Sequence, residues 1–188
     1  MTLAFFEEII VAKNSPRECG SCTACCQGWL RVQVGDVIVK PGSPCPQIHS
    51  NRCSVYENRP TTCADFNCAW LINDLDYPDW MRPDNAKVIL KYIDLVSSIS
   101  AIGAIPTGTK VSPRVLNFLR QLANQHGLPV LHFQRTKEQG RYLPEVAVTA
   151  FGPPGMEHLF SQIQEKIERI EYMGAKEPQP PTRPNSDD

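Results

Sequence analysis

The residues best suited to chemistry in this chain are eight cysteines that fall within one stretch. The first group is a CxxCxxCC string made of Cys19, Cys22, Cys25 and Cys26. The second group is dispersed and consists of Cys45, Cys53, Cys63 and Cys68. Cysteine thiolates are soft metal ligands, and a CxxC pair suits one metal because a two-residue spacer lets the chain turn both sulfurs toward one point. The cysteines therefore predict metal binding, with all eight as candidate ligands.

The adjacent pair Cys25 and Cys26 bears on the number of metal sites. Neighbouring side chains in extended backbone point to opposite sides, so both thiolates reaching one ion would strain the chain. Eight thiolates make two four-sulfur sites, or one four-sulfur site with spare ligands. Spacing alone does not assign the other six cysteines, and both arrangements stay open.

The identity of the metal also stays open. The CxxCxxC run resembles the start of a bacterial ferredoxin motif and favours an iron–sulfur cluster such as 4Fe-4S. CxxC pairs with separated partners favour Zn²⁺ about as much. His49, between Cys45 and Cys53, is a weaker ligand candidate, because a single loop histidine is more often solvated.

The expected cellular compartment decides whether the cysteines are interpreted as metal ligands or as disulfides. The first ten residues lack the basic start and long apolar run of a signal peptide, which predicts a cytoplasmic protein. Thiols stay reduced in the cytoplasm, so a thiol cluster there is more often a metal site than a set of disulfides.

Charged and aromatic side chains near the cysteines have a physical use beside a metal. Four thiolates around a divalent centre leave net negative charge, which nearby arginines can offset. The candidates are Arg17, Arg31, Arg52 and Arg59, with Arg59 preferred. Aromatic side chains could restrict solvent around the metal or simply form a small core, and they are Trp29, Tyr56, Phe66 and Trp70.

The elements that must position the cysteines are short. Residues 2–12 have apolar side chains at helical spacing and predict a helix. The segment 17–70 is too irregular for long helices. In it, 29–34 alternates like a strand, and 36–40 continues it past Gly35 as a hairpin or a bent strand. This segment has little apolar material of its own, so metal is expected to hold it.

The chain after Pro83 resembles an ordinary α+β domain. Residues 87–105 predict one or two strands, and Ser112-Pro113 opens a helix that Gly127 ends. Residues 129–135 and 141–151 predict two strands, and 156–173 predicts a second helix. The predicted class is α+β, with a cysteine-rich region (1–82), an α+β region with two helices and short strands (83–174), and a disordered tail (175–188).

Composition limits the function classes. Of the 188 residues 41% are hydrophobic, enough to bury a core, and the formal net charge is −1. This balance argues against a nucleic-acid binder that neutralises phosphates. No segment approaches the roughly 18 uninterrupted apolar residues of a membrane span, so no membrane association is expected.

The cysteines and the residues between them resemble the CxxCxxCC cysteine-cluster family (YkgJ-like proteins). The resemblance rests on the eight cysteines in order together with Pro46, Tyr56, Arg59-Pro60 and Phe66, and covers about 19–70. The family is described as a zinc- or iron-chelating domain, so the resemblance implies metal binding and no particular reaction.

The sequence leaves enzymatic activity undecided. It contains no nucleophile–base set, no P-loop, no dinucleotide fingerprint and no CxxxCxxC spacing. The predicted function is a metal-binding protein that serves redox chemistry or electron transfer beside a protein partner. The alternative is a structural zinc-binding interaction module.

Overall fold

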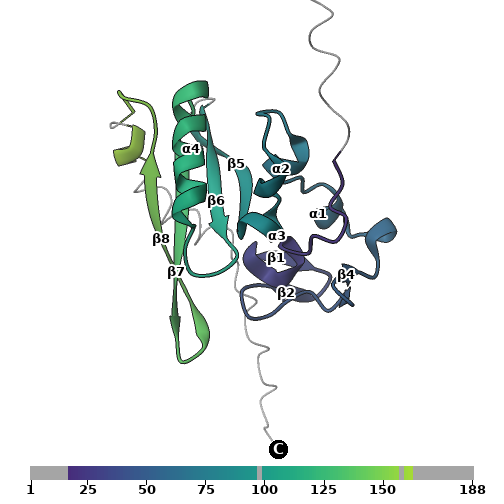
Figure 1. The fold of residues 1–188 in the computed structure, drawn as a ribbon. Helices are drawn as coiled ribbons and strands as arrows, with labels where there is room; N and C mark the ends of the chain where they lie inside the picture. Colours follow the sequence, from purple (N-terminus) through teal and green to yellow (C-terminus); the bar gives the residue numbers. More distant parts are fainter. Residues whose placement is uncertain (1–16, 97–98, 157–158, 163–188) are drawn as a thin grey trace, which may run out of the picture. The chain divides into compact units, whose positions relative to one another are not determined.

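The computed structural model describes residues 17–96, 99–156 and 159–162 (Figure 1). Met1–Pro153 form one compact unit and Pro154–Asp188 a second. Residues 159–162 in the second unit are helical, as predicted. The rest of that predicted helix, the helix predicted at 2–12 and the tail at 175–188 lie outside the described residues.

The cysteine-rich segment consists of very short elements. A π-helical turn, η1 (Cys25–Trp29), is followed by strands β1 (Val32–Val34) and β2 (Val37–Val39). Val34 pairs with Val37 in an antiparallel register, so a hairpin forms at Gly35 and a bent strand does not. The remaining elements are β3 (Ile48–His49), β4 (Arg52–Cys53), η2 (Tyr56–Asn58) and α1 (Thr61–Ala64). The absence of long helices predicted for this segment holds throughout its described residues.

Three short helices connect this segment to a sheet. They are α2 (Ala69–Ile72), η3 (Asp79–Met81) and α3 (Pro83–Ala86). Both α2 and α3 pack against β5 (Val88–Val96), the first strand of the sheet. Cys68 immediately precedes α2, so the last cysteine of the sequence lies where the cysteine-rich segment meets the sheet.

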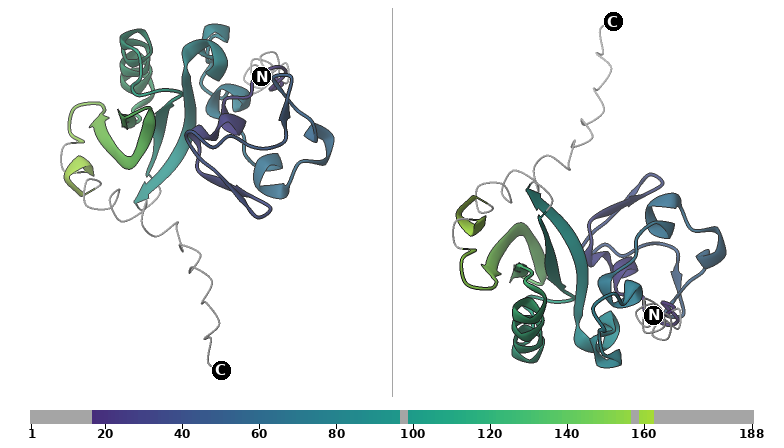
Figure 2. Two further views of the ribbon diagram at one scale, coloured as in Figure 1. Left: turned by 90° about the horizontal axis from the view of Figure 1, so that it is seen from below. Right: turned by 90° about the horizontal axis from the view of Figure 1, so that it is seen from above.

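The sheet has four strands in the order β5-β6-β7-β8, where β6 is Ile99–Pro106, β7 is Val130–Glu138 and β8 is Arg141–Phe151. The pairs β5–β6 and β7–β8 are antiparallel, whereas β6–β7 is parallel. The parallel pair is joined by α4 (Pro113–His126), which lies against the sheet (Figure 2). The α+β class is confirmed, and β8 has the bounds predicted for its strand, 141–151.

The ends of α4 are those predicted. The Ser112 hydroxyl accepts a hydrogen bond from the Val115 N–H, which caps the start of the helix, and proline occupies the first helical position. Gly127 ends the helix at φ 67°, a left-handed conformation that glycine adopts without strain.

One hydrophobic core joins the connecting helices, the sheet and α4. Tyr77 and Met81 are 1% and 0% exposed, and they cluster with Leu90, Ile102 and Leu119. Between residues 17 and 67, in contrast, the buried residues are Thr23, Ala24, Gly28 and Val39. The cysteine-rich segment thus has very little core of its own, as the sequence predicted.

Among the residues that the structure describes, no helix is long and apolar enough to cross a membrane.

Candidate metal centre

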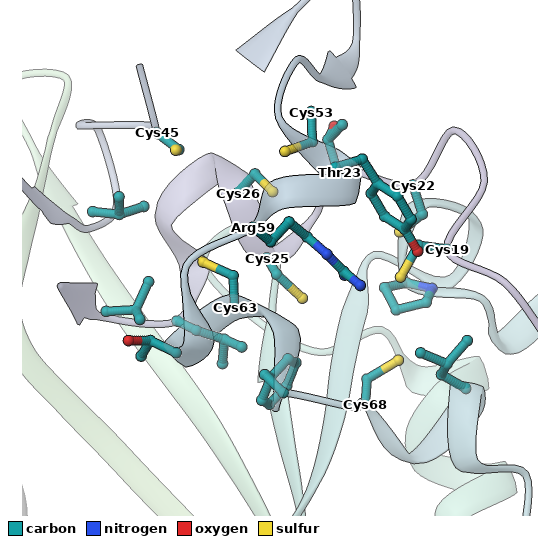
Figure 3. Close-up of a pocket in the computed structure, with 18 of the residues that line it drawn as sticks. Cys19, Cys22, Thr23, Cys25, Cys26, Cys45, Cys53, Arg59, Cys63 and Cys68 are labelled. Carbon is teal, nitrogen blue, oxygen red and sulfur yellow. The ribbon is translucent and has the colours of Figure 1, made fainter. Parts of the chain in front are cut away.

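All eight cysteines line one pocket, and all are free thiols (Figure 3). The cavity has a volume of about 280 Å³. A buried water needs roughly 10–15 Å³, so the cavity has room for far more than one small ion. The stretch from Cys19 to Cys68 therefore folds around a shared space.

Local hydrogen bonds bring separate parts of the segment to this pocket. The Cys22 N–H donates to the Cys19 carbonyl at 2.9 Å, which closes the first CxxC turn. The Cys45 N–H donates to the Cys26 carbonyl at 2.8 Å and joins the second cysteine group to the first. Cys53 lies on β4 and Cys63 on α1.

Gly28 makes the close approach of η1 and β2 feasible. Its φ is 90°, and a Cβ atom at this position would lie 2.1 Å from the Lys40 carbonyl oxygen. That contact is impossible for any larger residue. Glycine is required here so that the chain can turn from Cys26 and return past Lys40 toward Cys45.

The eight thiols divide into two groups around the adjacent pair. Cys25 has Cys68, Cys22 and Cys19 as neighbours besides Cys26. Cys26 has Cys53, Cys45 and Cys63 as thiol neighbours besides Cys25, with Cys19 a weaker one. We call these the inner set, comprising Cys19, Cys22, Cys25 and Cys68, and the outer set, comprising Cys26, Cys45, Cys53 and Cys63. In Figure 3 the inner set extends toward Cys68 and the outer set toward Cys45.

Cys25 and Cys26 point into different thiol groups, but the extended backbone expected to cause this is wrong. The backbone at Cys25 and Cys26 is helical, in η1, and not extended. Consecutive side chains on any helix, a π-helical turn included, nevertheless point in different directions around its axis. The two thiols therefore point into different groups for a helical reason.

Burial makes three of these thiols weaker acids than an ordinary cysteine. It raises the pKa of Cys26 and of Cys68 to about 11 in each case, and neighbouring thiols add to the effect. Burial raises the pKa of Cys25 further, with the nearby Cys68 and Cys22 contributing. At neutral pH these groups are protonated without metal, so binding a metal would release protons.

Backbone amides point at two sulfurs of the inner set. The Cys22 sulfur accepts hydrogen bonds from the N–H groups of Ala24 and Asp84, which lower its pKa against the effect of burial. Cys68 accepts from Leu71 and Trp70 in the same way. Such N–H donors stabilise a thiolate, as they do around metal-bound cysteines.

The donor set suits Zn²⁺ or an iron–sulfur cluster, because both take four thiolates. Within residues 17–96, 99–156 and 159–162, no three Cys, His, Asp or Glu side chains converge closely enough to hold an ion as they stand. The chemistry of the donors thus fits the expected metals, whereas the sulfurs surround the cavity in an open arrangement.

Four basic side chains line the pocket: Arg31, Arg59, Arg82 and Lys91. The Arg59 guanidinium lies 4.0 Å above the Tyr56 ring, its charge lowers the pKa of Cys63 against the effect of burial, and its buried Nε has no hydrogen-bond partner. Arg17 does not line the pocket. It donates to the Trp70 carbonyl at 2.9 Å and stacks on the Trp70 ring, which is a role in packing.

Of the aromatic residues, Arg52 and His49 that the sequence singled out, some line the pocket and others do not. The aromatic side chains that line the pocket are Tyr56, Phe66 and Trp70. Trp29 packs edge-on against Tyr142 instead, with ring centroids 5.1 Å apart. Arg52 and His49 are not among the lining residues in the described part of the chain.

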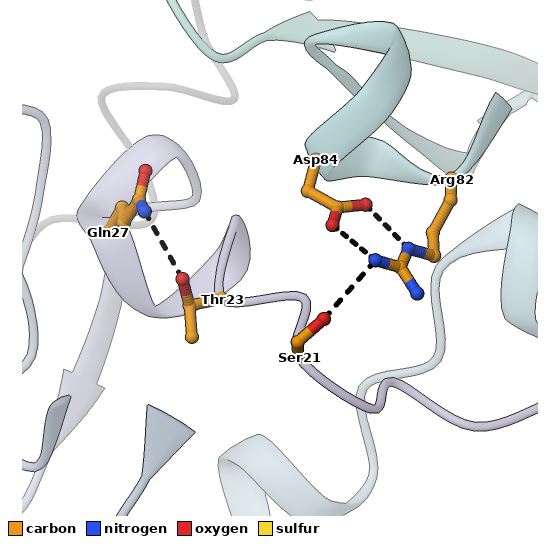
Figure 4. Close-up of polar contacts among 5 residues, drawn as sticks. All are labelled: Ser21, Thr23, Gln27, Arg82 and Asp84. Atoms are coloured by element: carbon orange, nitrogen blue, oxygen red, sulfur yellow. Dashed lines mark hydrogen bonds and ion pairs between the residues drawn. The ribbon is translucent and has the colours of Figure 1, made fainter. Parts of the chain in front are cut away.

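The sequence analysis did not single out Arg82 and Lys91, which lie after the last cysteine, Cys68. Arg82 donates to both Asp84 oxygens and, at 3.3 Å, to the Ser21 hydroxyl (Figure 4). Ser21 lies in the first CxxC turn, so this contact ties the turn to α3. A second contact in this region runs from Gln27 Nε2 to Thr23 Oγ1 at 3.1 Å. No spacing signal marks either basic residue, because their proximity depends on the tertiary fold.

Comparisons of the chain match no protein-family model, no curated protein and no solved structure at a significant level. The resemblance to the CxxCxxCC family therefore stays a prediction that rests on the cysteine spacing.

Proposed function

We propose that this chain is a metal-binding protein whose eight thiols hold an iron–sulfur cluster or Zn²⁺. The observation that carries the proposal is that all eight cysteines, as free thiols, line one pocket. A disulfide scaffold would pair them, and a purely structural role in packing would bury them in the core. Instead seven of the eight are only partly buried and face a shared cavity.

Two observations bear on what the metal does. Phe66, Trp70 and Leu71 put apolar surface around the cavity, which would limit water at a redox centre. This favours the iron–sulfur reading, in which the protein serves electron transfer beside a partner protein; the cluster itself supplies the redox change when bound.

The alternative is a structural zinc module without catalytic activity. It is favoured by the scarcity of buried residues between positions 17 and 67, because such a segment needs cross-links to stay folded. Zinc supplies such cross-links and no redox change. In either reading, the chain's own contribution is the thiol set, the basic side chains around it and the N–H groups directed at Cys22 and Cys68.

Anaerobic purification followed by metal analysis, sulfide analysis and a visible spectrum tests the proposal. A brown protein with acid-labile sulfide supports the iron–sulfur reading, and a colourless protein with stoichiometric zinc supports the structural one. A folded protein without bound iron, zinc or another thiophilic metal would overturn the proposal.

A pair of variants shows that the pocket is the binding site. Cys22→Ser removes a thiol that accepts two backbone hydrogen bonds, so it should lower the bound metal. Thr62→Ala alters a residue that lines the same pocket without a thiol, and it should retain the metal. Equal metal content in both variants would place the metal elsewhere.

A further inference from the structure

We infer that the two thiol sets form unequal metal sites, in which the inner set holds its metal as part of the fold and the outer set exchanges its metal with solution. The inference rests on the proposed function, because it assigns different behaviour to two parts of the same pocket. It is carried by packing, by hydrogen bonding and by the contact of α2 and α3 with the sheet strand β5.

Three of the four inner cysteines contact the hydrophobic core. Cys68 is 8% exposed and is a member of the core cluster, and Cys22 and Cys25 pack against that cluster. Within the described residues these are the cysteines that contact the core. Displacing these three sulfurs would therefore disturb the packing of the core.

The chain also fixes the inner sulfurs through connections to the sheet side of the molecule. Asp84, in α3, directs its N–H at Cys22, and Trp70 and Leu71, in α2, direct theirs at Cys68. Both helices pack on β5. The Arg82 contact with Ser21 holds the first CxxC turn to the same region. These N–H donors and supports orient Cys22 and Cys68, which favours tight binding once the sulfurs close around a metal.

The outer set is supported by small elements. Cys53 lies on the two-residue strand β4, which pairs only with the two-residue strand β3. Cys63 lies on the four-residue helix α1, and Cys45 lies in a turn joined to Cys26 by one backbone hydrogen bond. Segments with few buried contacts open by local fluctuation at low free-energy cost. Metal held there can be lost while the core stays folded.

Arg59 places the outer set beside a cation. Its charge acts on Cys63, and its partly buried guanidinium lies on the exposed Tyr56 ring, whose hydroxyl also contacts Cys19 of the inner set. A charged side chain at the mouth of an openable site offsets thiolate charge and leaves the site accessible to an incoming ligand. The outer set is thus the part of the pocket suited to taking up and giving away a thiophilic metal ion.

Release kinetics of the full-length protein test this division. The protein is purified anaerobically with the metal it carries, and release is followed with chromogenic chelators for Zn²⁺ and Fe²⁺. We expect two metal centres per chain and two phases, the faster by roughly tenfold or more. Release in a single phase would overturn the division and leave the proposed function intact. A chain that binds no metal would overturn both.

Cysteine variants show which thiol set gives each phase of metal release. Cys45→Ser should remove the fast phase and keep the slow one, whereas Pro44→Ala, which alters its exposed neighbour, should keep both. Cys68→Ser should remove the slow phase and lower the melting temperature. If Cys68→Ser does not fold, Cys45→Ser alone decides: loss of both phases in a folded Cys45→Ser protein would show one joint site and contradict the inference.

Discussion

Arg59 carries a charge placed to help a thiol of the pocket ionise. It lines the pocket, stacks on Tyr56 at 4.0 Å and lowers the pKa of Cys63 against the effect of burial. Removing its charge should leave the thiols harder to deprotonate. We expect Arg59→Met to weaken metal binding by about 10- to 100-fold, the usual effect of losing a group that supports metal ligands.

Competition with a chelator of known affinity measures this effect. Arg52→Met is the matched control, because Arg52 is an exposed arginine of the same segment that does not line the pocket. Equal affinities for the two variants would contradict the role given to the Arg59 charge.

His132 makes stability depend on pH. It is 6% exposed, its Nδ1 has no hydrogen-bond partner, and burial together with the Arg120 charge lowers its pKa. In the unfolded chain its pKa is about 6.5. As the pH falls through that value, the unfolded chain gains a proton that the folded protein does not, so the free energy of unfolding decreases until the pH passes the folded pKa.

Denaturant unfolding at pH 7.5 and 5.5 checks this sign. His132→Gln should lose part of the drop in stability that the wild type shows between the two values. The exposed His126, at the end of α4, provides the control His126→Gln, which should keep the drop. An unchanged drop in His132→Gln would assign the pH dependence to other groups.

At the scale of elements, Gly28 determines how η1 meets β2. A Cβ atom there would overlap the Lys40 carbonyl, and φ of 90° strains any other residue. We expect Gly28→Ala to displace the chain between Cys26 and Cys45 and to lower both metal content and melting temperature. The backbone strain alone costs about 1–2 kcal/mol.

Gly35→Ala is the control for this change. Gly35 also has positive φ, 58°, but nothing lies within 4 Å of its Cβ position. It should therefore cost stability through strain while the metal content stays normal. Normal metal content in Gly28→Ala would show that the close approach is not needed for the site.

The elements also show how far the sequence predicts the fold. The bounds of α4 follow from Ser112, Pro113 and Gly127, because caps act through neighbouring residues. The β7–β8 pair follows from two strand-like runs on either side of a turn, whereas the sequence left 29–40 open between the hairpin that forms and a bent strand. The parallel pairing of β6 with β7 does not follow, because periodicity identifies strands without giving their neighbours.

The same distinction holds for the site. The adjacent Cys25 and Cys26 raised the question of two thiol groups, but the sequence left one site with spare ligands equally open, and the backbone expected to be extended is helical here. The assignment of Cys68 to the first group depends on where α2 packs, and Lys91 reaches the pocket only because β5 lies beside it. Such proximity is a property of the tertiary fold.

At the scale of the whole molecule, metal removal should separate two parts of one compact unit. Residues 17–67 contain few buried side chains, whereas the core around Tyr77 and Met81 continues into the sheet. We expect chelation at neutral pH to abolish amide protection between 17 and 67 and to preserve it in β5–β8.

Hydrogen exchange with mass spectrometric readout, before and after chelation, measures this prediction. Peptides from α4, whose buried face includes Leu119 and Leu122, serve as the internal reference. Simultaneous loss of protection in the sheet and the cysteine-rich segment would show that they unfold as one cooperative unit.

The position of Cys68 before α2 has a consequence for biosynthesis. A ribosome makes the chain from its N-terminal end, so every cysteine is translated before the sheet that buries Cys68. The outer thiols lie wholly within 26–63 and can meet metal on the nascent chain. The inner thiols acquire their packed surroundings only after β5, β6 and α4 have been synthesised. If the chain binds metal as proposed, translation would favour loading the outer thiols before the inner ones, and a shortage of metal would leave chains with a complete sheet and an exposed cysteine-rich segment.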